Sequence, residues 1–134
     1  MSRAAWVGRS KSLLAGVLVL ASLASPSLVQ ARKSVPADSL ATMAVAELPP
    51  QGRQTLQLIR EGGPFPYSKD GSVFGNRERL LPSRQRGYYL EYTVKTPGSR
   101  DRGARRIVCG GQPRTPDTCY YTGDHYASFS RIAE

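Results

Sequence analysis

The stretch GYYLEYTVKT, residues 87–96, is rich in β-branched and aromatic residues and predicts a β-strand. Three further runs of similar character follow it: ARRIVCG at 104–110, CYYTG at 119–123 and SFSRI at 128–132. Turn-forming sequences, TPGSRDRG and GQPRTPD, separate the first three runs. Because these connections are short, we expect the strands to be antiparallel neighbours in one sheet.

A single helix is expected before the strands. Apolar residues recur at helical spacing in QGRQTLQLIREGG, residues 51–63. Pro50 suits the first turn of a helix, and the Gly-Gly-Pro sequence at 62–64 ends it, so we predict a helix over 50–61. Residues 64–82 indicate an ordered loop with one short strand near 72–74. One N-terminal helix packed on a small twisted antiparallel sheet makes an α+β domain.

The first 31 residues have the layout of a secretory signal peptide. Three basic residues precede the apolar run LLAGVLVLASLA at 13–24, and Val29 and Ala31 stand at −3 and −1 of a cleavage position. The alternative is a membrane anchor, but the run of about a dozen residues is shorter than the roughly 20 that a spanning helix needs. The expected organisation is a signal peptide at 1–31, a flexible lead-in at 32–44 and a folded domain at 45–134.

Positive charge is the main compositional signal. The chain has 19 Lys and Arg against 10 Asp and Glu, for a net charge of +9. Loss of the three basic residues of the signal peptide leaves about +6. Such an excess indicates a polyanionic partner, which on charge alone is RNA, DNA or an anionic membrane. The alternative is a cationic surface that serves only solubility.

The two cysteines, Cys109 and Cys119, predict a disulfide, because an even number of cysteines in an exported chain is usually paired. A buried free Cys109 is the alternative, since its position lies on the apolar face of its strand. Two thiols and one distant histidine do not make a complete ligand set, so we expect neither a metal nor a cofactor.

Strand alternation places several charged side chains together. In residues 88–94, Tyr88, Leu90, Tyr92 and Val94 share an apolar face, which leaves Glu91 on the other. If the next strand aligns its own apolar face, Arg102 and Arg106 join Glu91 there. The exit of the third strand brings His125, the only histidine, near the same face.

A carboxylate, two guanidiniums and an imidazole suit RNA cleavage without a metal. The carboxylate accepts the 2′-hydroxyl proton, an imidazolium protonates the departing 5′-oxygen, and arginine stabilises the charged transition state. Asp124 is expected to favour the charged form of His125. The alternatives are a solvated salt-bridge face and a histidine in a structural niche.

Three segments resemble the small secreted bacterial guanyl-specific ribonucleases, relatives of barnase: GPFPYSKDGSVFGNRERLLP at 63–82, GYYLEYTVKTPGSRDRGARRIVCG at 87–110 and YYTGDHYASFS at 120–130. The resemblance extends from about residue 45 to residue 132. It implies the microbial ribonuclease fold and cleavage through a 2′,3′-cyclic phosphate to a 3′-phosphate end. By this resemblance Glu91 is the general base and His125 the general acid. Arg102 and Arg106 bind the phosphate, which Tyr126 also contacts.

The loop VFGNRERL, residues 73–80, resembles the guanine-recognition loop of that family. One carboxylate can accept from both N1–H and N2–H₂ of guanine, and Glu78 is the candidate. Backbone N–H groups near Gly75, Asn76 and Arg77 are expected to bind O6, and Phe74 to lie against the base. Unpaired bases expose these edges, so we expect single-stranded RNA to be preferred. The alternative makes Glu78 a surface partner of a neighbouring arginine.

Two departures from the family are visible. Its members most similar to this chain pair a cysteine near the N-terminus with one at the C-terminus, whereas Ala44 stands at the first position and the chain ends before the second. Gly75 replaces a larger residue of the recognition loop, which predicts a more mobile loop.

The leading interpretation is a secreted, monomeric, guanyl-preferring endoribonuclease, periplasmic or extracellular, with no stable membrane association after signal cleavage. One alternative is a non-catalytic cationic domain that binds RNA or an anionic surface. Glu91 discriminates between them, because a carboxylate in a basic face weakens phosphate binding. Another is a toxin ribonuclease with a dedicated cytosolic protein inhibitor.

Overall fold

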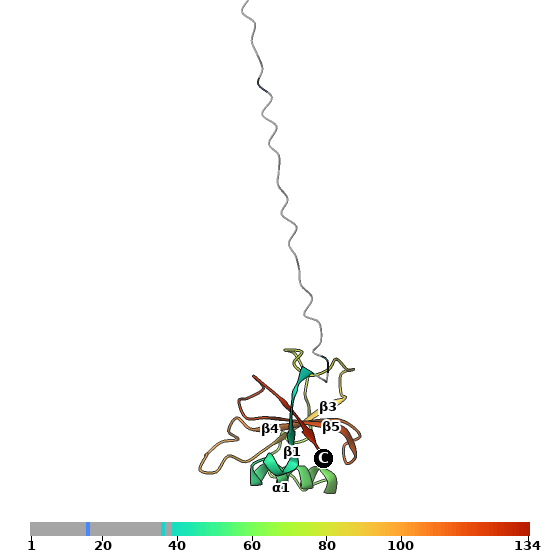
Figure 1. Ribbon diagram of the computed structural model, residues 1–134. Helices are drawn as coiled ribbons and strands as arrows, with labels where there is room; N and C mark the ends of the chain where they lie inside the picture. Colours follow the sequence, from blue (N-terminus) through green and yellow to red (C-terminus); the bar gives the residue numbers. More distant parts are fainter. Residues whose placement is uncertain (1–15, 17–35, 37–38) are drawn as a thin grey trace, which may run out of the picture. The chain divides into compact units, whose positions relative to one another are not determined.

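The computed structural model describes residues 16, 36 and 39–134, and the expected signal peptide at 1–31 lies, apart from Gly16, outside them. The described elements form one helix and a six-stranded sheet with the order β1-β6-β5-β4-β3-β2 (Figure 1). The strands are β1 (Ala41–Ala44), β2 (Ser72–Val73), β3 (Tyr89–Thr93), β4 (Arg106–Gly111), β5 (Pro116–Thr122) and β6 (Ser130–Ala133). A short 3₁₀ helix, η2 (Val45–Glu47), precedes the helix α1 (Pro50–Glu61). The α+β class, with the helix packed on a mostly antiparallel sheet, is confirmed.

The helix has the predicted bounds for the predicted reasons. Pro50 occupies its first position, and Gly62 ends it in the left-handed conformation at φ 86°, with its N–H bonded to the Leu58 and Ile59 carbonyls. Its buried residues, which repeat every three or four positions, are Gly52, Thr55, Leu56 and Ile59. Thr55 also donates its hydroxyl to the Thr93 carbonyl at 3.1 Å, which ties the helix to β3.

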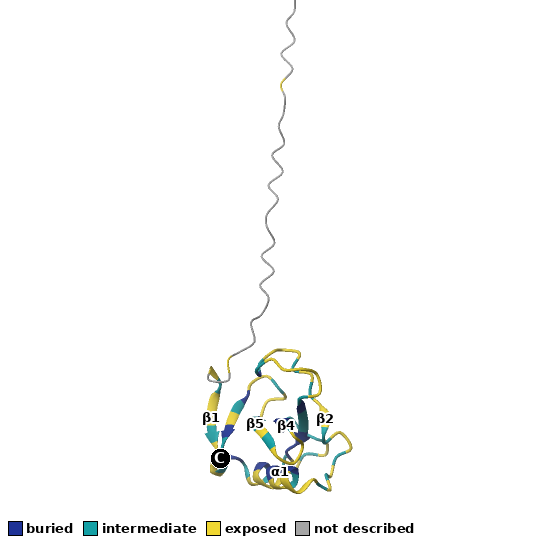
Figure 2. Cartoon of the chain, turned by 90° about the vertical axis from the view of Figure 1, so that its right-hand side faces the viewer, coloured by how far each residue is buried: buried dark blue, intermediate teal, exposed yellow. Residues whose placement is uncertain are grey.

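The sheet separates two hydrophobic clusters. On the helix side, Leu56 and Ile59 pack with residues of β3 and β4, including Tyr92 and Ile107. On the other side, Leu81 of the long loop covers Val108 and Tyr120. Figure 2 shows the buried residues on the central strands and on the side of α1 that faces them. The second cluster matters for function, because it supports the face that carries Glu91.

One part of the expected lead-in is structured. Residues 41–44, within the segment 32–44 that we expected to be flexible, form β1, which pairs with β6 in parallel from Ala41↔Ser130 to Ala44↔Ala133. The Ala44 N–H also donates to the Glu47 carboxylate at 2.6 Å. The sequence of β1, ATMA, has no alternation that would predict a strand. The strand forms because it pairs with β6, near the other end of the domain.

The assignment of Tyr88 to the helix-side face was wrong. Its ring belongs to the second cluster and lies over Gly110, at a point where a side chain on residue 110 would collide with the ring. The strand begins only at Tyr89, after a turn in which Gly87 has φ 95°, so strand alternation does not extend to residue 88. The predicted face holds for Leu90, Tyr92 and Val94, which pack in the helix-side cluster.

The predicted disulfide between Cys109 and Cys119 is present. The two residues are directly opposite each other in the β4–β5 ladder, and both are buried in the helix-side cluster. The bond therefore joins neighbouring strands within the core. β5 begins at Pro116, inside the segment 111–117 that we expected to be a turn, and the register shifts at Gly110–Gly111.

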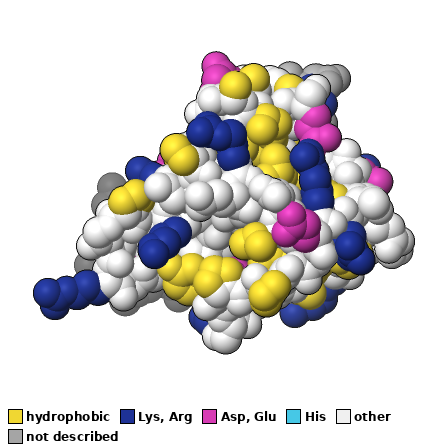
Figure 3. Space-filling view, turned by 90° about the horizontal axis from the view of Figure 1, so that it is seen from below, with side chains coloured by type: hydrophobic (Ala, Val, Ile, Leu, Met, Phe, Trp, Pro, Cys, Tyr) yellow, Lys and Arg dark blue, Asp and Glu magenta, His cyan; other side chains and the backbone are white. Residues whose placement is uncertain are grey.

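Positively charged side chains are scattered over the face of the domain that is seen from the side of α1, with fewer acidic ones between them (Figure 3). No helix among residues 16, 36 and 39–134 is long and apolar enough to cross a membrane.

Candidate active site

Sheet register places Glu91 at the centre of the open face. It lies opposite Val108 of β4 and Ser72 of β2, and its side chain is 15% exposed. One carboxylate oxygen is 3.4 Å from the Arg102 guanidinium, and the other accepts the Tyr126 hydroxyl at 2.9 Å. Glu91 is therefore a mostly buried carboxylate that is held at both oxygens.

Two arginines surround this carboxylate in different ways. Arg102 donates Nε to the Thr93 hydroxyl at 3.0 Å, which fixes its guanidinium beside Glu91. Arg106 is only 3% exposed, and its Nη1 donates to backbone carbonyls of the preceding turn, at 2.8 Å to Arg105 and 3.0 Å to Gly103. Within residues 39–134 its Nε is buried without a hydrogen-bond partner. A buried, unpaired donor on a fixed cation suits an anionic ligand, because leaving it unpaired costs roughly 1–3 kcal/mol.

Asp124 organises the loop that follows β5. Its carboxylate accepts hydrogen bonds from the Thr122 hydroxyl at 2.8 Å and from both the backbone N–H and the hydroxyl of Ser128, at 2.9 and 2.5 Å. The Ser128 hydroxyl bond is the leading reason that the pKa of Asp124 lies below its ordinary value. These contacts tie the Asp124 carboxylate to its own loop, and its expected effect on His125 stays a prediction.

This loop presents His125 and Tyr126 in an unusual backbone conformation. Both have positive φ, 54° and 71°, which costs non-glycine residues of order 1–3 kcal/mol each. The His125 N–H donates to the Ala104 carbonyl at 2.9 Å, so the loop is fastened to the segment that enters β4. Burial, followed by the hydrogen bond to Glu91, raises the pKa of Tyr126 above its ordinary value.

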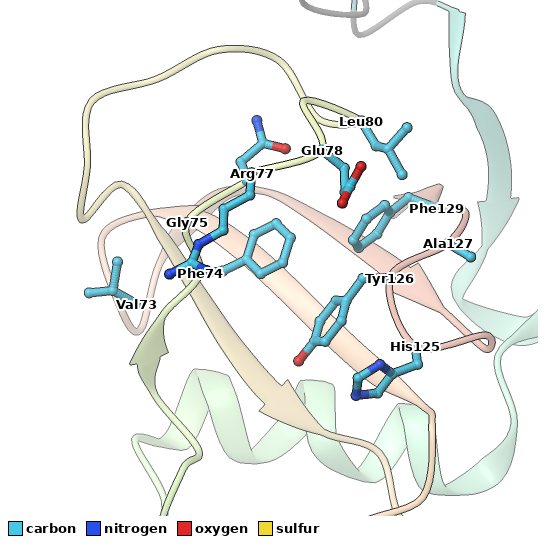
Figure 4. A pocket seen from close by; sticks show the side chains of 11 residues that line it. Val73, Phe74, Gly75, Arg77, Glu78, Leu80, His125, Tyr126, Ala127 and Phe129 are labelled. Carbon is cyan, nitrogen blue, oxygen red and sulfur yellow. The ribbon is translucent and has the colours of Figure 1, made fainter.

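A cavity of about 710 Å³ opens beside these residues, between the recognition loop and the loop after β5. Phe74 and Tyr126 stack across it with ring centres 5.2 Å apart, and Phe129 meets the edge of Phe74 at 5.8 Å (Figure 4). His125 lies at the rim on the same side as Tyr126. The aromatic walls suit a planar ligand.

The recognition loop is shaped by its own side chains. The Asn76 amide donates to the Leu81 carbonyl at 2.8 Å and accepts from the Leu81 N–H at 3.1 Å, so its side chain is held within the loop. Arg77 extends beside Gly75, close enough that a Cβ on residue 75 would be in ordinary van der Waals contact with it. In Figure 4 the Glu78 carboxylate points into the space between Phe74 and Phe129.

The structure brings the expected site residues together. Those that line the cavity are Phe74, Gly75, Asn76, Arg77, Glu78, His125 and Tyr126. Glu91 and Arg106 contact Tyr126, and Arg102 contacts Glu91. Sequence reasoning missed Phe129 as a wall and Thr122 as a buried anchor. Phe129 lies in the run 128–132, which predicts a strand and gives no indication of a cavity wall. Thr122 could have been found, because Ser and Thr residues close to an Asp commonly form hydrogen bonds within a loop. Among the described residues no group of three or more His, Cys, Asp or Glu side chains could hold a metal ion.

Comparisons with known proteins agree with this geometry. A ribonuclease family model matches residues 30–133. Guanyl-specific ribonuclease Sa from Kitasatospora aureofaciens is 55% identical over 71% of this chain and 96% of its own. Guanyl-specific ribonuclease Sa3 from the same organism is 64% identical over 63% of this chain, and the match spans 58% of the relative's length.

Solved structures show the same fold. Ribonuclease Sa2 with guanosine-2′-cyclophosphate is 48% identical, with a TM-score of 0.65 over 71% of this chain and 97% of its own. A second crystal structure of ribonuclease Sa2, with 3′-GMP, is 47% identical, with a TM-score of 0.63 over 70% and 97%.

Proposed function

The chain belongs to the guanyl-specific ribonuclease family, and we propose that it cleaves single-stranded RNA on the 3′ side of guanosine through a 2′,3′-cyclic phosphate. The observation that carries this proposal is Glu91, a carboxylate held between Arg102 and Tyr126, the second of which also lines the aromatic cavity. A domain that only binds RNA gains nothing from a negative charge there, since that charge repels phosphate. The geometry therefore favours catalysis over the non-catalytic alternative.

In the first step Glu91 takes the proton of the 2′-hydroxyl as its oxygen bonds to phosphorus. The bond from phosphorus to the 5′-oxygen breaks, and that oxygen receives a proton from the His125 imidazolium. In the second step His125 accepts a proton from water as the water attacks the cyclic phosphate. The 2′-oxygen leaves with the proton that Glu91 holds, which returns both groups to their starting forms.

The cations act on the charge that develops on the phosphate. Arg106 is fixed by backbone carbonyls, and Arg102 by Thr93, so neither has to reorganise as the reaction proceeds. The Tyr126 hydroxyl, which Glu91 holds in the free protein, is placed to donate to a phosphate oxygen once the 2′-hydroxyl takes its place at the carboxylate.

Guanine selection rests on the recognition loop. The Glu78 carboxylate accepts from N1–H and N2–H₂, backbone N–H groups of residues 75–77 donate to O6, and Phe74 stacks on the base. Adenine lacks the adjacent pair of donors, so it cannot make the bidentate contact with Glu78. We expect Glu78→Ala to reduce the preference for guanosine roughly 10- to 100-fold, the value of one bidentate base contact.

Mapping of the cut sites tests the proposal. The protein is incubated in EDTA with a single-stranded oligonucleotide that contains each base, and the ends are identified by mass spectrometry. The expected products end in guanosine 2′,3′-cyclic phosphate and later in guanosine 3′-phosphate. Glu61→Ala, which removes an exposed carboxylate at the end of α1, is the control for Glu78→Ala. Intact RNA at high protein concentration would refute the proposal, and equal cleavage after all four bases would refute the base assignment.

The location and partners are part of the same proposal. Residues 1–31 act as a signal peptide, and the exported protein begins near Arg32, works as a monomer and requires no metal. The basic, apolar and small-residue order of these residues supports export. Sequencing the N-terminus of the exported protein checks this, and recovery of Met1 there would contradict it. A cytosolic inhibitor would serve to protect the producing cell.

A further inference from the structure

The face that carries Glu91 has a second hollow at its other side. Cross-strand neighbours share a face, and the pairs Glu91–Val108, Val108–Tyr120 and Tyr120–Arg131 therefore form one row. Three strand spacings of about 4.8 Å place Arg131 about 14 Å across the sheet from Glu91. There a cavity of about 270 Å³ lies between the start of β3, β5 and the loop at 82–84.

Tyr88 forms the flat wall of this second cavity. One side of its ring lies over Gly110, where any side chain would displace it. The Arg84 guanidinium stands over the ring, 4.7 Å from its centre. Because the guanidinium already covers the ring, a nucleobase would stack on the outer face of Arg84 or replace it over Tyr88, since every base has a flat π surface.

Polar groups complete the cavity. The Tyr88 hydroxyl donates to the Asp117 carboxylate at 3.1 Å, which fixes the ring and leaves carboxylate oxygen facing the hollow as an acceptor for base amino groups. Arg84 and Arg131 are both exposed and supply positive charge at the rim. A stacking surface, an acceptor and two cations match a base with its phosphate.

We propose that this hollow, formed by Arg84, Tyr88, Asp117 and Arg131, is a second nucleotide-binding subsite, which takes an RNA nucleotide other than the cleaved guanosine. The identity of the ligand rests on the proposed ribonuclease function. The two cavities share a wall segment, because Leu80 lines the first and Pro82 the second, with Leu81 buried between them. An RNA chain longer than a dinucleotide is needed to reach both.

Direct binding tests the subsite without catalysis. The first cavity is filled with 3′-GMP, and 5′-AMP is then titrated while the amide resonances of Gly110 and Thr118 are followed by nuclear magnetic resonance. We expect saturable shifts at these two amides. Tyr88→Leu, which keeps apolar cover on Gly110 but removes the aromatic ring, should weaken binding roughly fivefold or more. Arg84→Gln should weaken binding as well, and Arg114→Gln, an equal charge change beside Gly62 at the end of α1, is its matched control.

Kinetics then separate a subsite for the substrate chain from a site for a free nucleotide. For the dinucleotide GpU, Tyr88→Leu and Arg84→Gln should leave KM and kcat unchanged. For a hexanucleotide with one guanosine, placed in turn near each end, both variants should raise KM about threefold or more in at least one placement. The placement that responds shows whether the subsite takes nucleotides upstream or downstream of the cut.

Several results would overturn the proposal. These are the absence of shifts at Gly110 and Thr118 up to millimolar 5′-AMP, shifts of equal size in Tyr88→Leu, or an equal KM effect in Arg114→Gln. Shifts at these amides with an acidic peptide but not with 5′-AMP would assign the hollow to a protein partner instead. Failure of the ribonuclease assignment alone would appear as normal binding of 5′-AMP with no cleavage of any RNA.

Discussion

Glu91 and Arg106 stand on adjacent antiparallel strands, whereas His125 and Tyr126 stand in a loop where both residues have positive φ. In the described part of the chain all the non-glycine residues with positive φ lie in the two loops around the cavity, namely Asn76, Arg79, His125 and Tyr126. The strands thus supply groups that the sheet ladder holds without strain. The loops supply groups that only a strained backbone can present.

Each loop compensates for its strain with an internal anchor. Asn76 bridges to both backbone groups of Leu81, and Asp124 holds Thr122 and Ser128. The strand-borne residues have no need of such anchors. The comparison teaches that damage to the strands should reduce overall stability, and damage to the anchors should mainly disturb the geometry of the site.

The largest effect should come from the proposed base and acid, Glu91 in a strand and His125 in a loop. We expect Glu91→Gln and His125→Gln each to reduce kcat/KM by about 100-fold or more, because general acid–base catalysis contributes that much or more. The pH profile of the wild type should be bell-shaped. Glu91→Gln should lose its acidic limb and His125→Gln its basic limb. Near-normal turnover in both variants, together with weaker RNA binding, would show that neither residue is catalytic.

Removal of the disulfide tests the prediction that damage to the strands reduces stability. Cys109→Ala with Cys119→Ala should lower the free energy of unfolding by roughly 2.5–3 kcal/mol, the chain-entropy value for a loop this short. Urea denaturation measures it, and the wild type under reducing conditions is the control. Turnover in native buffer should change less than about twofold, because the bond lies on the helix side of the sheet. If turnover in native buffer fell by much more than twofold while the variant remained folded, the bond would affect the site directly. That result would contradict the view that damage to the strands mainly reduces stability.

Changes at Asn76, the anchor of the recognition loop, should have a smaller effect on stability. Two variants separate the contribution of its hydrogen bonds from that of its backbone conformation. Asn76→Ala removes the bonds to Leu81 and places a side chain at φ 48°, whereas Asn76→Gly removes the same bonds and tolerates that conformation. We expect both to relax guanosine preference, and Ala to be less stable than Gly by about 1 kcal/mol. Equal stability of the two variants would show that the backbone is not strained there.

Asp124 should have the smallest effect, and one that depends on pH. Its hydrogen bonds lower its pKa in the folded state, so their contribution is complete above the unfolded carboxyl pKa of about 3.9 and is lost as pH falls through the lower folded value. The difference in urea midpoint between the wild type and Asp124→Asn should therefore be constant at neutral pH and shrink in acid. A difference that persists unchanged to about pH 2 would mean that charge is not involved.

Local patterns predicted the groups that the strands carry. Alternation in residues 89–94 placed Glu91 opposite the apolar face, and the Gly-Gly-Pro sequence ended α1 at the correct residue. The same rule failed at Tyr88, because the turn at Gly87 interrupts the strand. The spacing of the residues also placed His125 only near the site. The direction of its side chain depends on the positive φ values of His125 and Tyr126, which the sequence does not indicate. Its role, like that of Glu78, came from the family resemblance.

Long-range pairing was the other limit. Nothing within residues 41–44 indicates a strand, because the pairing is decided by β6 near the other end of the domain. The second cavity was equally hidden, since Arg84, Asp117 and Arg131 come from segments that no local motif connects.

The parallel pairing of β1 with β6 also determines when the sheet can be completed as the chain is synthesised. A chain that emerges N-terminus first releases β1 early, but the strand that completes its ladder comes last. Contacts this distant in the sequence slow folding, because the intervening chain must be ordered before they form. The sheet can close only once the whole domain has emerged, so no nascent fragment that lacks β6 holds the complete fold. This enzyme is able to degrade the RNA of the cell that makes it. The delay therefore keeps the incomplete chain from reaching the complete fold while it is still on the ribosome.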